Sequence, residues 1–271
     1  MKDYVLELVS EKTGYNAKLN IMREYLQAFI LRIMHDNRVF RSAAFLGGTA
    51  LRFLYGLPRF SEDLDFSLEA ESQFIFKELA VKIKQELELA GYSISITYND
   101  EKTVQYAMIK FNKLMHEAGI SPHRDQKFSI KIEIDTRPPE GAGLKTEIVN
   151  KYFLVAFLSY DIPSLFAGKM HAILSRRYTK GRDYFDLGWY LSKWKDIRPN
   201  ILLLQNALIQ TGWKGEMPSE NSWRHVLHKA VIDADWQKVE DDIKGFLENP
   251  ADMDIFTKIN LLGLLKEEDP Y

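Results

Sequence analysis

Two aspartates separated by a single residue are the side chains of this sequence best suited to chemistry. Asp63 and Asp65 lie in an extended segment, residues 59–68, that predicts a strand. Because successive side chains of a strand point to opposite faces, the two carboxylates share one face with Ser67, and the apolar residues between them face the core. Two carboxylates that point the same way predict a site for metal and phosphate.

A glycine pair precedes these aspartates in the chain. Gly47 and Gly48 follow a short apolar run, and Thr49 is placed to cap a helix that runs to Tyr55. A glycine pair is most often an ordinary turn. Followed by a capped helix and an Asp-x-Asp strand, it predicts a phosphate site, because backbone N–H groups without a nearby Cβ can approach a triphosphate.

A third carboxylate comes from a second alternating segment, residues 128–136. Isoleucines occupy one face, and Glu133 and Asp135 lie on the other. The solvated polar face of an antiparallel strand would explain this pattern equally well. Together with Asp63 and Asp65, either acid could complete a three-carboxylate site.

Three carboxylates beside a glycine turn suit two Mg²⁺ ions roughly 4 Å apart. One ion would activate or orient an attacking hydroxyl, and the other would stabilise a leaving pyrophosphate. Mg²⁺ prefers oxygen ligands, and the chain has no cysteine. No histidine falls in these motifs, so the donors would be oxygen atoms.

The elements that must position these residues change in character along the chain. Before residue 138 we expect strands and helices in mixture, including a hairpin that turns at Asn99 and Asp100. A Pro/Gly-rich loop follows, and helices dominate after it. The helices expected from apolar spacing span residues 19–35, 49–55, 73–90, 161–177, 182–194, 199–210, 222–230, 236–247 and 252–265, and the strands span 59–68, 92–98, 103–111 and 128–136.

This order predicts an α+β protein with a mixed sheet and flanking helices, followed by a helical bundle. We place a first domain with the metal site at residues 1–150 and a helical domain at 151–271, which would complete the nucleotide and acceptor cleft. The tail, residues 266–271, is expected to fray.

Composition excludes several classes of protein. The formal net charge of −2 argues against bulk coating of nucleic acid, although a local basic wall of arginines and lysines remains possible. No apolar stretch approaches the roughly 20 residues of a membrane span, and the amino-terminal residues do not resemble a signal peptide. We therefore expect a cytoplasmic protein. The basic-wall candidates are Arg52, Arg59, Arg176, Arg177, Lys180 and Arg182.

Candidate residues in the helical half have ordinary explanations as well. Lys169 on a helix is most often a solvated lysine. Asp183 and Asp186 are neighbours at i, i+3 and could pair with Arg182 or Lys180 on a surface. Such surface pairs contribute about 0–1 kcal/mol, so stability gives little reason for the cluster.

The motifs together resemble a known superfamily. Leu46-Gly47-Gly48-Thr49, the Asp63–Asp65 strand and the Ile-Glu133-Ile strand resemble the DNA polymerase β-type nucleotidyltransferases. The longer set, GGTALR, RFSEDLDF, PSLFAGKMHA and KGRDYFDL, resembles the AbiEii/AbiGii toxin family, which includes the MenT toxins. These motifs cover residues 46–187.

The resemblance implies a role for each matching position. Gly47, Gly48 and Thr49 would cradle phosphates, where the family often has serine in place of the threonine. Asp63, Asp65 and Glu133 would bind Mg²⁺ or Mn²⁺, with Asp135 as the alternative third ligand. In the helical half, the implied nucleotide-binding and catalytic residues are Lys169, Arg182, Asp183 and Asp186.

The leading hypothesis is a metal-dependent nucleotidyltransferase that acts as the toxin of an abortive-infection toxin–antitoxin system in phage defence. It would transfer NMP from an NTP to RNA, and resemblance to the MenT branch implies the tRNA 3′ end. One alternative changes the acceptor to a small molecule or a protein hydroxyl. Another is a catalytically silent nucleotide-binding regulatory module, against which the intact acids argue.

Overall fold

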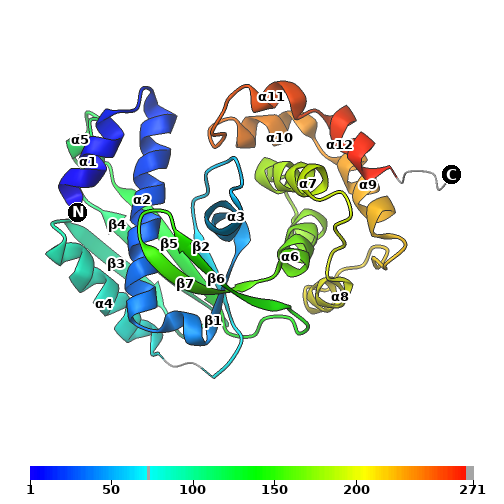
Figure 1. Cartoon of the computed structure of the whole chain (residues 1–271), viewed down its shortest axis with the longest axis horizontal. Coiled ribbons are helices and arrows are strands. Elements are labelled where there is room, and N and C mark those ends of the chain that lie inside the picture. Colours follow the sequence, from blue (N-terminus) through cyan, green and yellow to red (C-terminus); the bar gives the residue numbers. More distant parts are fainter. Residues whose placement is uncertain (72–73, 267–271) are drawn as a thin grey trace. The chain divides into compact units, whose positions relative to one another are not determined.

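The computed structural model describes residues 1–71 and 74–266 (Figure 1). The chain forms two compact units. The sheet unit comprises Met1–Gly56, Phe60–Pro138 and Lys145–Ser159, and the helical unit comprises Leu57–Arg59, Pro139–Leu144 and the chain from Tyr160 onward. A short segment before the aspartate pair therefore belongs to the helical unit.

A seven-stranded mixed sheet organises the sheet unit. Its strand order is β3-β4-β5-β2-β1-β7-β6. β2 runs parallel to β5 and antiparallel to β1, and β1 runs parallel to β7. The strands are β1 (Ala43–Leu46), β2 (Leu64–Leu68), β3 (Ile94–Asn99), β4 (Val104–Phe111), β5 (Phe128–Asp135), β6 (Leu144–Asn150) and β7 (Leu154–Tyr160).

Aromatic side chains fill the apolar face of this sheet at its centre. Phe45 of β1 stacks on Phe66 of β2 and on Phe157 of β7, with ring centroids 5.2 Å apart in both pairs. All three rings are buried, so this face is core and the polar residues of β2 and β5 must lie on the other. The helices of the unit are α1 (Lys2–Ser10), α2 (Tyr15–Asp36), α3 (Gly47–Tyr55), α4 (Phe76–Leu89) and α5 (Leu114–Glu117), with a 3₁₀ turn at Val39–Arg41.

The helix α6 (Ile162–Ser175) of the helical unit begins at an N-cap residue, Asp161. The Asp161 side chain accepts a hydrogen bond from the Ser164 N–H at 2.9 Å, and Pro163 lies in the first turn. Phe166 stacks on Tyr190 with centroids 4.7 Å apart, and Trp223 meets Phe166 edge-on. The helices are α6 (Ile162–Ser175), α7 (Gly181–Lys193), α8 (Ile201–Gln210), α9 (Trp223–Asp233), α10 (Trp236–Ile243), α11 (Asp252–Ile255) and α12 (Lys258–Leu265).

The predicted fold class is confirmed, and so is the hairpin of β3 and β4. The predicted strand at 59–68 is wrong in its first half, because β2 begins only at Leu64. Arg59 instead makes an isolated antiparallel bridge with Leu247 of the helical unit. Asp63 therefore immediately precedes the strand.

Two further differences from the predictions concern missed strands and one helix. β1, β6 and β7 lie where no strand is predicted, because β1 has only four residues and β6 is largely exposed and offers no core stripe. The predicted helix 252–265 is two helices, since the Thr257 side chain caps α12 by accepting from the Asn260 N–H. Gln73 and the tail beyond residue 266 lie outside the described residues. Among the helices that the structure describes, none has the length and apolar character needed to cross a membrane.

Candidate active site

Gly47 brings the start of α3 against the side chain of Asp65. Its φ of 79° lies in the left-handed region that favours glycine. A Cβ added at this position would lie 2.5 Å from Oδ2 of Asp65, closer than real Cβ atoms come. Glycine is therefore required both by the backbone conformation and by the close approach of the carboxylate.

Thr49 does not cap α3 as the sequence predicts. The helix begins two residues earlier, at Gly47, and Leu46 occupies the cap position without a side-chain hydrogen bond. The Thr49 hydroxyl is buried and donates to the carbonyl oxygen of Asp63 at 2.5 Å. Its role in this structure is to hold the backbone of the first aspartate.

Strand register places Glu133 beside Asp65. β2 and β5 are parallel, with Asp65 paired to Glu133 and Ser67 paired to Asp135. The Asp135 carboxylate accepts the N–H of Arg137 at 2.9 Å. Glu133 is thus the acid of β5 nearest in register to the aspartate pair, and Asp135 lies two residues further along the strand.

A lysine accompanies these acids. Nζ of Lys131 lies 2.6 Å from Oε1 of Glu133, and both side chains are about one-third exposed (31% and 30%). Burial lowers the pKa of Lys131, but the hydrogen bond and charge of Glu133 and the charges of Asp63 and Asp65 together raise it above its ordinary value. The four side chains therefore form one electrostatic group, which we call the strand carboxylate group.

The donor chemistry of the strand carboxylate group fits a hard divalent cation, because every anionic donor is a carboxylate oxygen. Within the described residues, however, no three His, Cys, Asp or Glu side chains are already gathered closely enough to hold a metal. Glu133 is engaged by Lys131 instead. Metal binding would need the glutamate to exchange this ammonium for the ion.

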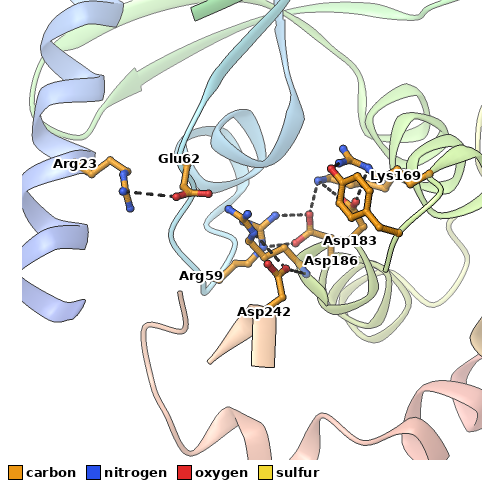
Figure 2. Close-up of polar contacts among 10 residues, drawn as sticks. Arg23, Arg59, Glu62, Lys169, Asp183, Asp186 and Asp242 are labelled. Atoms are coloured by element: carbon orange, nitrogen blue, oxygen red, sulfur yellow. Dashed lines mark hydrogen bonds and ion pairs between the residues drawn. The ribbon is translucent and has the colours of Figure 1, made fainter. Parts of the chain in front are cut away.

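α2 holds the segment that leads into Asp63. The Gln27 amide donates to the carbonyl oxygens of Ser61 and Glu62, at 3.1 and 2.9 Å. Arg23 lies 3.7 Å from the Glu62 carboxylate (Figure 2). Gln27 is not among the predicted site residues, although a signal exists: the buried polar residues of α2 follow helical spacing, at Asn20, Arg23, Glu24 and Gln27.

Glu24 of the same stripe anchors α3. It pairs with Arg52 of α3, and its carboxylate also accepts from Lys151 at 2.8 Å and from the Tyr152 hydroxyl at 3.1 Å. A buried carboxylate of this kind is stabilised only when it is paired and hydrogen-bonded. α3 and its glycine start are therefore fixed from the side of α2.

A second ionic group lies within the helical unit, and we call it the buried ion cluster (Figure 2). Asp186 of α7 has no exposed surface and accepts two hydrogen bonds from Arg59, at 2.6 Å from Nε and 2.5 Å from Nη2. Nζ of Lys169 lies 2.7 Å from Oδ2 of Asp186 and 3.1 Å from Oδ1 of Asp183. Nε of Arg176 lies 3.2 Å from Oδ2 of Asp183.

Charge pairing decides the protonation of this cluster. Burial raises the pKa of Asp183, but the charges of Lys169 and Arg176 together bring it below its ordinary value. Burial lowers the pKa of Lys169, and the carboxylates of Asp186 and Asp183 more than restore it. Asp183 is therefore ionised, and Lys169 is charged, at neutral pH.

Comparison with known proteins decides the family. Residues 30–258 match the family model described as nucleotidyl transferase AbiEii toxin, type IV TA system. The chain belongs to the AbiEii nucleotidyltransferase toxin family. It is therefore an NTP-dependent nucleotidyltransferase toxin of a type IV toxin–antitoxin system, a class that uses a divalent metal and has an antitoxin partner. No curated protein matches the sequence.

Solved structures share the AbiEii fold at low sequence identity. MenT4, a nucleotidyltransferase toxin from Mycobacterium tuberculosis, has a TM-score of 0.59 and 15% identity over 99% of this chain and 90% of its own. JHP933 from Helicobacter pylori has a TM-score of 0.52 and 21% identity, over 90% of this chain and 88% of its own. A putative nucleotidyltransferase from H. pylori has a TM-score of 0.52 and 20% identity, over 91% of this chain and 92% of its own.

The structure of this AbiEii chain groups its predicted site residues within each unit. In the sheet unit, Gly47, Asp65 and Glu133 come together, and Thr49 contacts Asp63 through its backbone. In the helical unit, Lys169, Asp183 and Asp186 are in contact and mostly buried, so the surface-pair explanation is wrong.

Arg182 and Arg59 make contacts that the sequence does not predict. Arg182 packs toward α10: its N–H donates to the Asp242 carboxylate at 3.1 Å, and its guanidinium lies 4.1 Å from the Phe246 ring centroid. Arg59, predicted only as part of a basic wall, is 2% exposed and is the main partner of Asp186. Its position just before the aspartate strand is the signal that could have singled it out.

Proposed function

We infer that the protein is the toxin of an AbiE-type abortive-infection system, active in phage defence, that transfers an NMP from an NTP to RNA. The acceptor that resemblance to the MenT branch favours is the 3′ end of tRNA. The observation that carries the chemistry is the parallel pairing of Asp65 with Glu133, with Gly47 packed against the Asp65 carboxylate. It supports a phosphate-binding helix start beside a pair of carboxylates.

Asp63, Asp65 and Glu133 are the residues that would hold Mg²⁺ or Mn²⁺. When bound, the ion stabilises the charge that develops on the phosphoryl oxygens during transfer. Asp135 is the less suitable third ligand, since its register partner is Ser67 and its carboxylate already accepts a backbone N–H. Lys131 would release Glu133 and remain as a cation at the edge of the group.

The reaction is a displacement at the α-phosphorus of the NTP. The acceptor hydroxyl loses its proton to a carboxylate of the site, and its oxygen forms the new bond to phosphorus. The bond from the α-phosphorus to the oxygen that bridges to the β-phosphate breaks, and pyrophosphate leaves. Gly47, Gly48 and Thr49 contribute the N–H groups at the start of α3 that bind phosphate oxygens.

The helical unit contributes nucleotide-binding residues in this proposal. Lys169, held by Asp186 and Asp183, supplies a positive charge for the triphosphate. Oδ2 of Asp183 is buried and forms an ion pair with Nε of Arg176 at 3.2 Å. Asp183 also lines a cavity of about 110 Å³ together with Arg176 and Lys180. In this proposal Asp183 holds Lys169 and Arg176 in place for the nucleotide. Arg182, in the first turn of α7, orients the start of that helix.

The test is transfer of label to RNA. The protein is incubated with Mg²⁺, each α-labelled NTP in turn and total tRNA, and the products are separated by size. We expect label in tRNA with the wild type, and none with Asp65→Asn. Chelation of the metal should abolish transfer in the same assay.

Other acceptors give distinguishable results. Label in a metabolite or in protein, with none in RNA, would replace the proposed acceptor by a small molecule or a protein hydroxyl. Full toxicity of Asp65→Asn in cells would instead identify a silent regulatory module. Co-purification of the toxin with the product of the adjacent gene tests whether the antitoxin binds it directly.

A further inference from the structure

A cavity in the sheet unit borders the strand carboxylate group. It has a volume of about 290 Å³ and lies where β2 and β5 begin. Asp63 and Lys131, two members of the carboxylate group, are among its lining residues. A molecule in this cavity would therefore meet the site of the transfer reaction directly.

The cavity presents three cations to its contents. Arg23 comes from α2, Lys127 from the loop before β5, and Lys131 from β5 itself. The Arg23 guanidinium lies 5.3 Å from the Phe128 ring centroid, which fixes its plane against the wall. Two acids, Glu62 and Asp63, also line the cavity. Glu62 lies 3.7 Å from Arg23 and Glu133 lies 2.6 Å from Lys131, so a ligand phosphate would share these two cations with the protein's own carboxylates and would meet Lys127 as well.

The remaining wall suits a flat apolar ring. Met108 of β4, Met115 of α5 and Phe128 line it together with Tyr15 and Leu19 of α2. Met108 is the cross-strand partner of Lys131, so an apolar surface and a cation stand side by side. Thioether and aromatic surfaces bind nucleobases by stacking and dispersion. The cavity thus combines the two kinds of contact that a nucleotide requires.

The size of the cavity limits its ligand to about one nucleotide. Its volume is at the lower end of the roughly 300–1,000 Å³ that small-molecule sites occupy. A base-paired end would not enter it, whereas an unpaired terminal nucleotide can be splayed out and stacked. A phosphodiester on the cations, a base on the apolar wall and a terminal hydroxyl near Asp63 would satisfy the lining.

We propose that this cavity binds the unpaired 3′-terminal nucleotide of the RNA acceptor, with Lys127 and Arg23 on its phosphate and Met108 on its base. The proposal rests on the proposed function, because it identifies the cavity with the acceptor side of that reaction. It also assigns specificity for single-stranded RNA ends to residues outside the strand carboxylate group.

The test measures binding without catalysis. Two 5′-fluorescein RNA duplexes, one with a four-nucleotide single-stranded 3′ end and one blunt, are titrated with protein by fluorescence polarisation in the absence of NTP. Wild type should prefer the single-stranded end by about 10-fold, the effect of one stacked base. Lys127→Glu should weaken this binding by about 10-fold, and Met108→Trp should remove the preference by filling the cavity.

Matched controls separate the cavity from general effects. Lys102→Glu makes the same charge change at an exposed position in the turn before β4, and should bind like wild type. Met108→Leu keeps an apolar wall and should keep the preference for the single-stranded end. Thermal melts of all four variants establish that they fold.

The outcomes distinguish failure of this proposal from failure of the proposed function. Unchanged binding and an unchanged KM for RNA in both cavity variants, with label still entering RNA, would overturn the cavity assignment only. Binding that the variants weaken, without any transfer to RNA, would overturn the proposed function and leave the cavity's ligand established. Label in protein, with no binding of either RNA, would overturn both.

Discussion

The strand carboxylate group and the buried ion cluster contain similar residues but differ in exposure and in charge balance. Asp63, Asp65 and Glu133 are partly exposed, and all three act on the charge of Lys131. In the buried cluster, Asp183 and Asp186 are 3% and 0% exposed and contact Arg59, Lys169 and Arg176. The four side chains of the first group carry three negative charges and one positive charge among themselves, and a ligand cation can offset this difference. In the second group, three protein cations surround two carboxylates, so the protein itself compensates both carboxylates.

This difference indicates where each group contributes. Like charges gathered at a partly exposed site repel one another unless a cation binds, and this arrangement is typical of functional sites. Buried and fully paired charges hold a structure strongly once formed, because removing one partner leaves an uncompensated charge. We therefore expect mutations in the strand group to affect activity first, and mutations of Asp186 to affect stability as well.

The largest expected effect is on activity, at the third carboxylate. Glu133→Gln should lower NMP transfer by about 10²–10³-fold, because it removes charge beside Asp65 where the transition state is stabilised. Asp135→Asn is the matched control on the same strand face, and its rate should stay within about threefold of wild type. The measurement is kcat/KM for labelled NTP. A larger loss of kcat/KM in Asp135→Asn than in Glu133→Gln would instead assign the role of third carboxylate to Asp135.

The next effect is on stability, at Asp186. Asp186→Asn should lower the free energy of unfolding by about 3–5 kcal/mol, because Arg59 and Lys169 lose the charge of their shared partner. All five tryptophans lie in the helical unit, so tryptophan fluorescence during urea unfolding reports on this unit. Asp242→Asn removes the partly exposed partner of Arg182 and should cost about 1 kcal/mol or less. Equal losses in the two variants would contradict the proposed difference in burial.

A smaller effect is expected at the glycine start of α3. Gly47→Ala should cost about 1–2 kcal/mol for the left-handed backbone and, in addition, displace the Asp65 carboxylate and lower transfer. Gly56→Ala is the matched control, because Gly56 has a similar φ of 71° with no atom within 4 Å of an added Cβ. Both variants should lose stability. Only Gly47→Ala should lose activity beyond its loss of folded protein.

The smallest effect concerns the pH dependence of the helical unit. The pKa of Asp183 is depressed in the folded state. Its ionised carboxylate therefore contributes to stability above the ordinary aspartate pKa of 3.8, and this contribution is lost as the pH falls through the pKa of the folded state. Stability by tryptophan fluorescence should therefore decline below about pH 4. Asp183→Asn should be less stable at neutral pH and should show a shallower decline. A parallel decline in both proteins would assign the acid sensitivity to other groups.

Sequence patterns predicted strands β2 to β5 of the sheet unit, because these strands alternate. The isoleucines of β5 and the Asp-x-Asp of β2 follow the two-residue period of a strand with one buried face, so the shared face of Glu133 and Asp135 could be predicted without a structure. The alternation of apolar and polar residues did not predict β6 and β7. β6 is mostly exposed, and β7 is a nearly continuous apolar segment that does not alternate.

Local sequence determined which residue types this protein brings to its chemistry: a glycine start, an aspartate pair, a third acid, and helices that carry Lys169, Asp183 and Asp186. Tertiary structure decided how they are used. Strand register chose Glu133 over Asp135 as the neighbour of Asp65, and no local propensity specifies the register between two strands that are far apart in the chain. Packing made Arg59 the partner of Asp186, 127 residues away, because buried charges must find partners wherever the fold provides them.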